Sequence, residues 1–270
     1  MSFYDELANL VVEMGLYASE VQKEITRSYK DDGTILTVAD TTINTTISNF
    51  IKTNYPEANI VTEEEKFPFK KDAPITFILD PIDGTDVYSQ GYPAWAISIG
   101  IINDKREAVG AMIYAPRWGL NSSEGLFLRL DPGGFLMLNG KEHTNRLENK
   151  ELKQFSMASH FPSHLTFGPM PYKIRSFGTN ILHMISPLIY KNVQGGVSIR
   201  CFVWDIAAAH ALLIADGFKV TYYDNKPFLY TDDILVGRNK IDTFLTYGTD
   251  DALGKLQNEV TKAYKAFNQK

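Results

Sequence analysis

The sequence predicts a layered α/β fold, and two observations carry the prediction. Apolar patterns of helical period and short apolar strands occur in both halves of the chain, which is typical of helices packed on sheets. The 270 residues are 44% apolar and 22% charged, an ordinary globular composition. We find no internal repeat or linker-like segment, so the length allows one large domain or two tightly packed halves.

In the first half, the periodicity predicts a long helix over residues 3–29 and a second helix with Asp40 as its N-cap. A turn is expected over KDDGTIL (30–36). Short apolar segments then predict strands, which we expect at 58–65, 76–80, 94–103 and 108–115, before a hairpin around DPGG (131–134). In the second half, a proline-rich loop is expected over 161–172, and helices are expected over 179–191, 204–217 and 250–266 with strands between them.

Composition also limits the partners and the compartment. The formal net charge of −5 argues against nucleic acid or an anionic membrane as the main partner. No apolar run approaches the roughly 20 residues needed to span a bilayer, and the first residues lack a secretory pattern. The single cysteine, Cys201, fits a reducing compartment. We therefore expect a cytoplasmic protein that acts on small molecules.

The stretch TFILDPIDGTDVYSQG (76–91) contains the densest chemistry. Phosphatases that form an aspartyl-phosphate need D-x-D-G-T after an apolar strand, with two aspartates two residues apart, but here Asp80 and Asp83 are three residues apart. The spacing therefore excludes this mechanism. Pro81 should prevent the strand from simply continuing, and a tight turn could then bring Asp80 and Asp83 to one side.

Such a turn would make a site for a hard cation. Two carboxylates and the exposed carbonyl of Ile82 are oxygen ligands suited to Mg²⁺ or Ca²⁺. Gly84 would let the backbone approach a ligand, and the amides of Gly84 and Thr85 could hold a phosphate. The competing interpretation is a solvated, aspartate-rich turn, which the preceding buried strand disfavours.

Two further acidic positions accompany this loop. A strand ends in the glutamates of IVTEEEK (60–66), which could equally form a solvated run of charge. Asp205 stands before the alanine-rich run of WDIAAAHALL, where an ordinary helix N-cap would also be sound. The small residues that follow Asp205 would let this helix pack closely against another element.

DPIDGT, the strand-ending EE and WDIAAA occur here in the same order as in the inositol monophosphatase family, which the chain resembles over roughly residues 5–240. LTVAD (36–40) and RSFGTNILHM (175–184) extend the resemblance. It implies a five-layer α-β-α-β-α sandwich and a Mg²⁺-dependent, lithium-sensitive phosphatase that is usually a homodimer. It also implies an N-terminal half (1–145) with the DPIDGT loop and a C-terminal half (146–270) with the WD aspartate, packed as one catalytic unit.

The resemblance assigns roles to individual residues. Thr85 should orient the attacking water, with Asp40 hydrogen-bonded behind it, and Glu63 should help to aim this water. The amides of Gly84 and Thr85 should hold the phosphate. The implied metal ligands are Glu63, Asp80, the carbonyl of Ile82, Asp83 and Asp205.

Counting charges supports the need for metal independently. The four carboxylates contribute about four negative charges, and a phosphomonoester adds nearly two more. Two or three Mg²⁺ ions would bring this total close to neutral, so metal is needed both to bind substrate and to hydrolyse it. The expected reaction is attack by a metal-activated water on a small phosphorylated metabolite, without a covalent phosphoenzyme.

The substrate-binding side departs from the family pattern. Inositol-selective members carry an acid seven residues before the WD aspartate, where this chain has Ser198, with Arg200 nearby. Asn180 replaces a small alanine in the GTN segment (178–180), and Asp86 adds an acid after DPIDGT. The candidate substrate-binding residues are therefore Asp86, Gly178, Thr179, Asn180, Ser198 and Arg200.

These departures leave several functions open. Phosphatases of 3′-phosphoadenosine 5′-phosphate, histidinol phosphate and fructose 1,6-bisphosphate belong to the same superfamily and remain alternatives. A non-catalytic protein that binds metal or phosphate on this fold is the alternative from another class.

Overall fold

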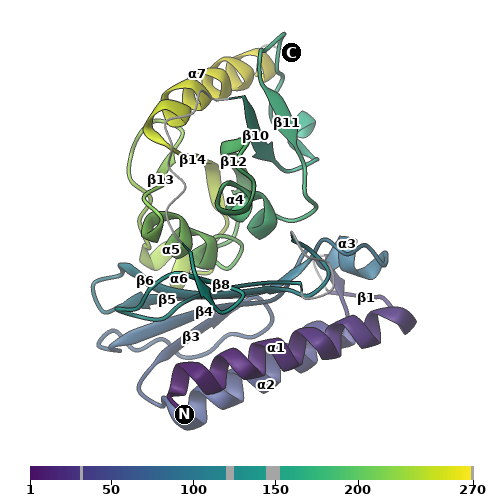
Figure 1. The fold of residues 1–270 in the computed structure, drawn as a ribbon, viewed down its shortest axis with the longest axis vertical. Coiled ribbons are helices and arrows are strands. Elements are labelled where there is room, and N and C mark those ends of the chain that lie inside the picture. The colour runs from purple at the N-terminus through teal and green to yellow at the C-terminus, as the bar shows by residue number, and fades with distance from the viewer. Residues whose placement is uncertain (31–32, 120–124, 144–152, 269–270) are drawn as a thin grey trace. The chain divides into compact units, whose positions relative to one another are not determined.

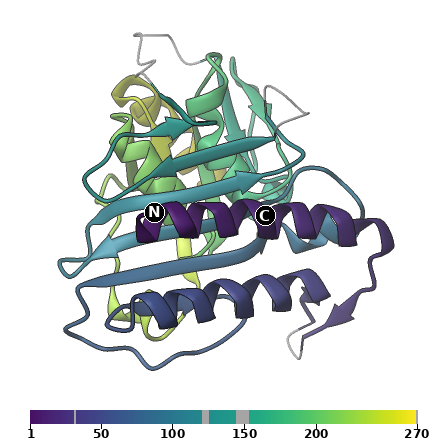
Figure 2. The same ribbon diagram turned by 60° about the horizontal axis from the view of Figure 1, so that its bottom comes forward.

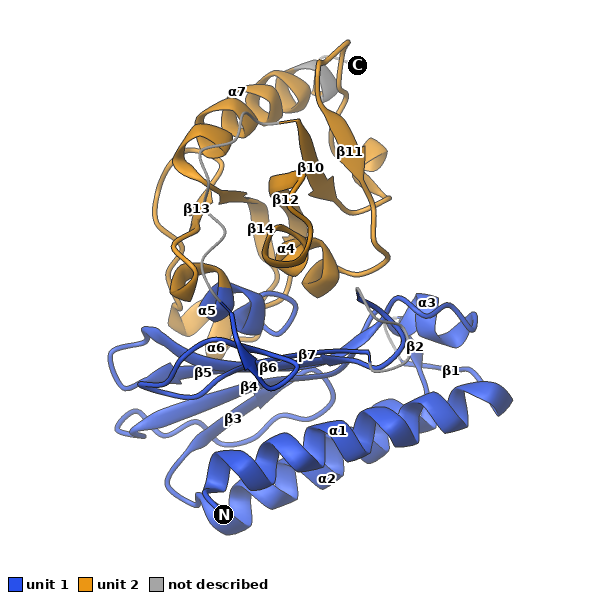
Figure 3. Ribbon diagram, viewed as in Figure 1, with its two compact units in different colours: residues 1–143, 204–212 blue, residues 144–203, 213–270 orange. Residues whose placement is uncertain are grey.

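The computed structural model describes residues 1–30, 33–119, 125–143 and 153–268, and it divides the chain into two compact units. Unit 1 comprises residues 1–143 and 204–212, and unit 2 comprises residues 144–203 and 213–270 (Figure 3). The WD segment therefore belongs to the same unit as the DPIDGT loop. Within the described ranges, no helix is both long and apolar enough to cross a membrane.

Unit 1 is built on a seven-stranded sheet of order β3-β4-β5-β6-β7-β8-β9. Its β3–β4 pair is parallel and the other pairs are antiparallel. The strands are β3 (Asn59–Thr62), β4 (Ile75–Asp83), β5 (Ala96–Asn103), β6 (Ala108–Ala115), β7 (Leu126–Leu130), β8 (Met137–Leu138) and β9 (Lys141–Glu142); a separate hairpin pairs β1 (Ser28–Tyr29) with β2 (Ile35–Leu36).

Two helices, α1 (Phe3–Val21) and α2 (Val38–Asn54), lie side by side against one face of this sheet (Figures 1 and 2). Their buried faces repeat at helical spacing, as Leu7 with Val11 and Ile43 with Ile47 show, and they pack with Phe77 of β4 in one apolar core. A short turn of 3₁₀-helix (Gln22–Glu24) follows α1, and α3 (Thr85–Ser89) follows β4.

Unit 2 has a five-stranded sheet of order β11-β10-β12-β14-β13 with helices α4 (Asn180–Ile189) and α7 (Asp250–Phe267) packed on it. Phe155, Val197 and Leu256 belong to its core. The strands are β10 (Gln154–Met157), β11 (Lys173–Arg175), β12 (Val193–Cys201), β13 (Lys219–Tyr222) and β14 (Ile241–Gly248), with a 3₁₀ turn (Phe161–Ser163) and helix α6 (Asp232–Leu235). Helix α5 (Ala207–Ala215) begins in unit 1 and ends in unit 2.

Several boundaries differ from the sequence prediction. The first helix ends at Val21 rather than at residue 29. The N-cap of α2 is Thr37, and Asp40 occupies the third helical position, from which its carboxylate accepts hydrogen bonds from the backbone and hydroxyl of Thr37. The predicted turn at KDDGT includes residues 31–32, which lie outside the described ranges, although Gly33 N donates to Lys30 O.

The prediction of a tight turn after Asp80 was wrong, because β4 continues to Asp83, although not as a regular strand. The strand keeps its pairing with β5 on both sides of the proline, and the register shifts between Asp80, which pairs with Ser98, and Asp83, which pairs with Ala96. This bulge accommodates the missing N–H of proline without ending the ladder.

A candidate metal centre in unit 1

The bulge in β4 brings together the two aspartates that the sequence singled out. Oxygens of Asp80, Asp83 and Asp205 all lie within 4.8 Å of one another, which is a suitable spacing for a shared cation. Asp80 is 1% exposed and Asp83 is 5% exposed, so these are not solvated surface acids. The interpretation as a solvated aspartate-rich turn is therefore excluded.

Asp205 reaches this cluster because α5 lies unusually close to β5. A Cβ built on Gly100 would stand 2.6 Å from the Cβ of Ala207 and 2.8 Å from the backbone nitrogen of Ala208. Gly100 is two residues from Ser98, the partner of Asp80, so its missing side chain would point to the face of the sheet that carries Asp80. The alanines after Asp205 thus allow the close packing that the sequence predicted.

The electrostatics of Asp80 fit a cation ligand. Burial raises its pKa well above the usual value, and the neighbouring carboxylates of Glu63, Asp83, Asp205 and Asp40 raise it further. Its Oδ1 atom is buried and has no hydrogen-bond partner. Uncompensated buried carboxylates are expensive, and a divalent cation would satisfy this one. The donor set, all oxygen, fits Mg²⁺.

Glu63 and Glu64 are held by a cation that the sequence did not single out. Lys30 Nζ lies 2.8 Å from Glu63 Oε1 and 2.7 Å from Glu64 Oε1. Burial would lower the pKa of Lys30, but the two glutamates outweigh it and raise the pKa. Burial and the charge of Glu63 raise the pKa of Glu64 to about 7. A lone lysine before a turn gives no sequence signal, which is why this contact was not predicted.

Thr85 begins α3 and lies between two acceptors. Its Oγ1 is 3.0 Å from Asp40 Oδ1 and 3.0 Å from the carbonyl of Ile82. The single hydroxyl proton can go to only one of them, and the oxygen can still accept from a third group. Burial raises the pKa of Asp40, although hydrogen bonds from Thr37 and Thr85 oppose this. Thr85 and Asp40 thus form the contact that the family resemblance implied.

Gly84 makes the connection between β4 and α3 possible. Its φ is 92°, a left-handed conformation that side-chain-bearing residues rarely adopt. Asp86 lies in the first turn of α3, where its carboxylate and carbonyl accept hydrogen bonds from Gln90.

The other candidate substrate-binding residues belong to unit 2. Gly178, with φ 108°, precedes Thr179, the N-cap of α4, whose hydroxyl accepts from Leu182 N. Ser198 on β12 donates to Asn180 Oδ1 at 2.8 Å and lies 3.4 Å from Cys201 Sγ. The structure therefore brings Asn180 and Ser198 into one uncharged polar cluster.

Arg200 differs from these residues. It sits at a bulge in β12 with φ 27°, and its half-exposed side chain lies 3.4 Å from Asp242. His160 and His164 flank the 3₁₀ turn Phe161–Ser163.

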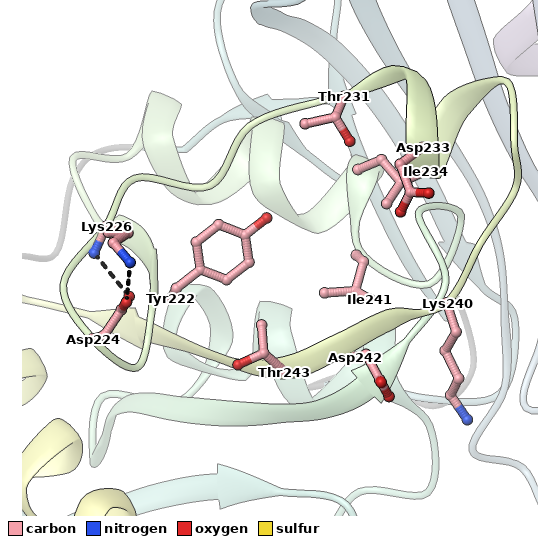
Figure 4. A pocket seen from close by; sticks show the side chains of 10 residues that line it. All are labelled: Tyr222, Asp224, Lys226, Thr231, Asp233, Ile234, Lys240, Ile241, Asp242 and Thr243. Carbon is pink, nitrogen blue, oxygen red and sulfur yellow. Dashed lines mark hydrogen bonds and ion pairs between the residues drawn. The ribbon is translucent and has the colours of Figure 1, made fainter.

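Unit 2 also has an open cavity of about 380 Å³ beside β13, α6 and β14, which the sequence did not predict. Figure 4 shows the ion pair of Lys226 with Asp224 on one side and Lys240 and Asp242 on the other. Asp233 accepts from Asn239 at 2.7 Å, and Asp242 faces Arg200. Since each of its three aspartates already has a partner, the cavity indicates no particular ligand.

The sequence profile of the inositol monophosphatase family matches residues 6–260. The chain belongs to the inositol monophosphatase family. Among curated relatives, the Nus factor SuhB of Vibrio cholerae is 33% identical over 98 residues, a match that spans 36% of this chain and 36% of the relative's length.

Solved structures extend the likeness to the fold. An IMPase of Thermotoga maritima is 18% identical, with 99% of this chain and 100% of the other covered at a TM-score of 0.77. The staphylococcal IMPase-II, solved with inositol monophosphate, is 16% identical, with 100% and 98% covered at a TM-score of 0.74. These likenesses confirm the predicted layered α/β fold of the family.

Proposed function

We propose that this chain is a Mg²⁺-dependent phosphatase that hydrolyses a small phosphomonoester with water and without a covalent phosphoenzyme. The observation that carries the proposal is the cluster of Asp80, Asp83 and Asp205, in which a buried carboxylate oxygen lacks a hydrogen-bond partner. Family membership supports it, as does the contact between Thr85 and Asp40 beside the cluster.

Asp80, Asp83 and Asp205 would hold the metal, together with the carbonyl of Ile82 and, once Lys30 releases it, Glu63. Bound Mg²⁺ would lower the pKa of a water molecule and stabilise charge on the phosphate and leaving group. Two or three ions per site would balance the carboxylates and the phosphate.

The residues of the chain itself would orient the reactants. If Thr85 donates its proton to Asp40, its oxygen can accept a hydrogen bond from the attacking water and aim it at phosphorus. The backbone amides of Gly84 and Thr85 would hold the phosphate, because the left-handed turn at Gly84 leaves no side chain in the way.

For the substrate, we propose a small phosphorylated metabolite of the inositol phosphate type. The staphylococcal structure with inositol monophosphate supports this class. Asn180 and Ser198, with Gly178, Thr179, Arg200 and Asp86, are the residues we propose to set specificity. The uncharged side chains of Asn180 and Ser198 favour contacts with hydroxyl or amide groups of a substrate. The alternative substrates are 3′-phosphoadenosine 5′-phosphate, histidinol phosphate and fructose 1,6-bisphosphate.

The test is phosphate release from inositol 1-phosphate, 3′-phosphoadenosine 5′-phosphate, histidinol phosphate and fructose 1,6-bisphosphate, each with and without Mg²⁺. We expect release from at least one compound that stops in EDTA. Li⁺ should inhibit it, as the inhibitory lithium complex of a staphylococcal relative suggests. No release from any of the four, with Mg²⁺ still bound, would count against the phosphatase.

The alternative function is that of a non-catalytic binding protein. The Vibrio relative supports this alternative, because it is named as a Nus factor and not as a phosphatase. The variant Thr85→Ala separates the two. A phosphatase should lose roughly 100-fold or more of its turnover while binding Mg²⁺ nearly unchanged. A binding module would lose nothing measurable. A homodimer, a cytoplasmic location and the lack of a nucleic-acid partner stay predictions.

A further inference from the structure

Helix α3 is too short to hold its own position. It has five residues, and Tyr88 N to Gly84 O is its first closing hydrogen bond at 2.9 Å. A helix of this length has no independent stability, so contacts with the rest of the unit must fix it. Thr85 lies on this helix, which makes those contacts relevant to catalysis.

Gln22, at the C-terminal end of α1, contacts the C-terminal end of α3 and the segment that follows it. Its Nε2 donates to the carbonyl of Tyr88 at 2.8 Å and to the carbonyl of Tyr92 at 2.9 Å. Its Oε1 accepts from Trp95 Nε1 at 3.3 Å and from Arg117 at 2.7 Å. Gln22 is 5% exposed, and these four bonds use the full capacity of its amide.

The side chain of Tyr88 is a second link between α3 and α1. Its hydroxyl donates to Ala18 O on α1 at 2.7 Å, and the ring meets Trp95 edge-to-face at 5.0 Å between centroids. Tyr88 and Trp95 are both fully buried. The end of α1 is therefore bound to α3 through the side-chain amide of Gln22 and the hydroxyl of Tyr88. Helix α3 also carries Thr85.

We propose that Gln22 is a positioning residue for the hydrolytic reaction: by tying the carbonyls of Tyr88 and Tyr92 to the end of α1, it fixes α3 and, through it, the hydroxyl of Thr85. This rests on the proposed function, in which Thr85 orients the attacking water. The aspartates of the metal cluster do not lie on α3, so their affinity for Mg²⁺ should not depend on Gln22.

Gln22 needs both the donors and the acceptor of its amide, so a substitution that removes only the donors tests its role directly. Gln22→Glu keeps the shape of the side chain and the one acceptor oxygen that faces Trp95 and Arg117. It loses the two N–H donors, so a carboxylate oxygen would face the carbonyls of Tyr88 and Tyr92, and α3 would have to move. Arg117→Met is the complement, because it removes a partner on the acceptor side and leaves both donors in place.

A matched control exists in unit 2. Gln257 on α7 is 6% exposed, and its Nε2 donates to Thr221 Oγ1 at 3.0 Å and to Thr246 Oγ1 at 3.3 Å. Gln257→Glu therefore removes two buried donors from the same kind of side chain without touching α3. Tyr88→Phe, which loses only the bond to Ala18, is a milder variant should Gln22→Glu fail to fold.

The experiment measures kcat, KM and the Kd for Mg²⁺ on the intact chain, together with amide hydrogen exchange over residues 84–92. For Gln22→Glu we expect kcat to fall by roughly 10- to 100-fold, KM to rise because the amides of Gly84 and Thr85 would move with α3, the Kd for Mg²⁺ to change by less than about threefold, and exchange to accelerate. Tyr88→Phe should show the same pattern at a few-fold. Gln257→Glu and Arg117→Met should keep kcat within about threefold of the wild type.

Two results would overturn the proposal. One is an active wild type whose Gln22→Glu or Tyr88→Phe variant loosens residues 84–92 without a change in kcat. The other is an equal loss of kcat in Gln22→Glu and Gln257→Glu, which would mean a general loss of stability. A wild type that hydrolyses nothing would instead overturn the proposed function, and the positioning role with it.

Discussion

Two buried polar clusters, one in each unit, differ in how their polar atoms are satisfied. Unit 1 gathers the carboxylates of Asp80 and Asp83 below the surface and leaves Asp80 Oδ1 without a hydrogen-bond partner. In unit 2, an uncharged cluster is buried and paired: Ser156 Oγ lies 2.9 Å from the hydroxyl of Tyr247 and 3.0 Å from Ser186 Oγ. A buried carboxylate without a hydrogen-bond partner is costly unless an ion compensates its charge, whereas a paired neutral cluster stabilises the fold without an ion.

The largest effect should come from removing one charge in unit 1. Asp80→Asn should lower Mg²⁺-dependent phosphate release by roughly 1000-fold, because a metal ligand is lost. In EDTA at pH 8 the same variant should be more stable than the wild type by about 1 kcal/mol, since like charges no longer repel in a buried cluster.

Urea unfolding in EDTA measures the second half of this prediction. Ser48→Ala, which removes another buried and unpartnered polar atom but no charge, is the control. An Asp80→Asn variant that unfolds more easily than the wild type without metal would show that this carboxylate supports the fold rather than a cation.

Unit 2 should lose stability in acid through His183. Its Nε2 accepts from Phe177 N at 2.8 Å, and burial first and His160 second lower its pKa to about 3. Since the unfolded pKa is near 6.5, the unfolded chain binds the proton first, and stability is lost as the pH falls below 6.5. We expect a loss of about 2 kcal/mol from this group by pH 5.

The check is the free energy of unfolding at pH 7 and pH 5 for the wild type and for His183→Gln. The variant should have a shallower pH dependence, while His164→Gln, at a half-buried position, should keep the wild-type slope. Equal slopes in all three proteins would mean that His183 is not buried in its neutral form.

Lys30 tests the electrostatics of the acidic site in unit 1, because its ammonium group pairs with Glu63 and Glu64 there. Lys30→Met frees Glu63 and Glu64 and makes the site more negative, so Mg²⁺ should bind roughly three- to tenfold more tightly. Without metal, this variant should be destabilised by about 1 kcal/mol. Thermal unfolding over a Mg²⁺ series measures both effects, and weaker Mg²⁺ binding would contradict this role.

The smallest effect is expected at Ser198. Ser198→Ala removes the hydrogen bond to Asn180 and should change the ratio of kcat/KM between two substrates by about threefold, with the Mg²⁺ dependence unchanged. A uniform loss for every substrate would place Ser198 among structural rather than specificity residues.

The sequence predicted the grouping of the three aspartates better than the contacts around them, for a physical reason. Asp80, Asp83 and Asp205 are few, charged and set at the ends of apolar segments, so their types and order already indicate their chemistry. The bulge at Pro81 was missed because strand pairing on both sides of a proline depends on β5. Lys30 and Gln22 were missed because their partners lie 33 to 95 residues away, and no local pattern distinguishes them from surface lysines and glutamines.

The most direct test of the central claim is calorimetric titration of Mg²⁺ into EDTA-treated, dialysed protein, with Asp80→Asn and Asp205→Asn beside the wild type. We predict saturable binding to the wild type, with both variants weakened at least 10-fold, because each loses a ligand of the same cluster. Binding of equal strength in all three proteins would contradict the account, since Mg²⁺ would then bind outside this cluster.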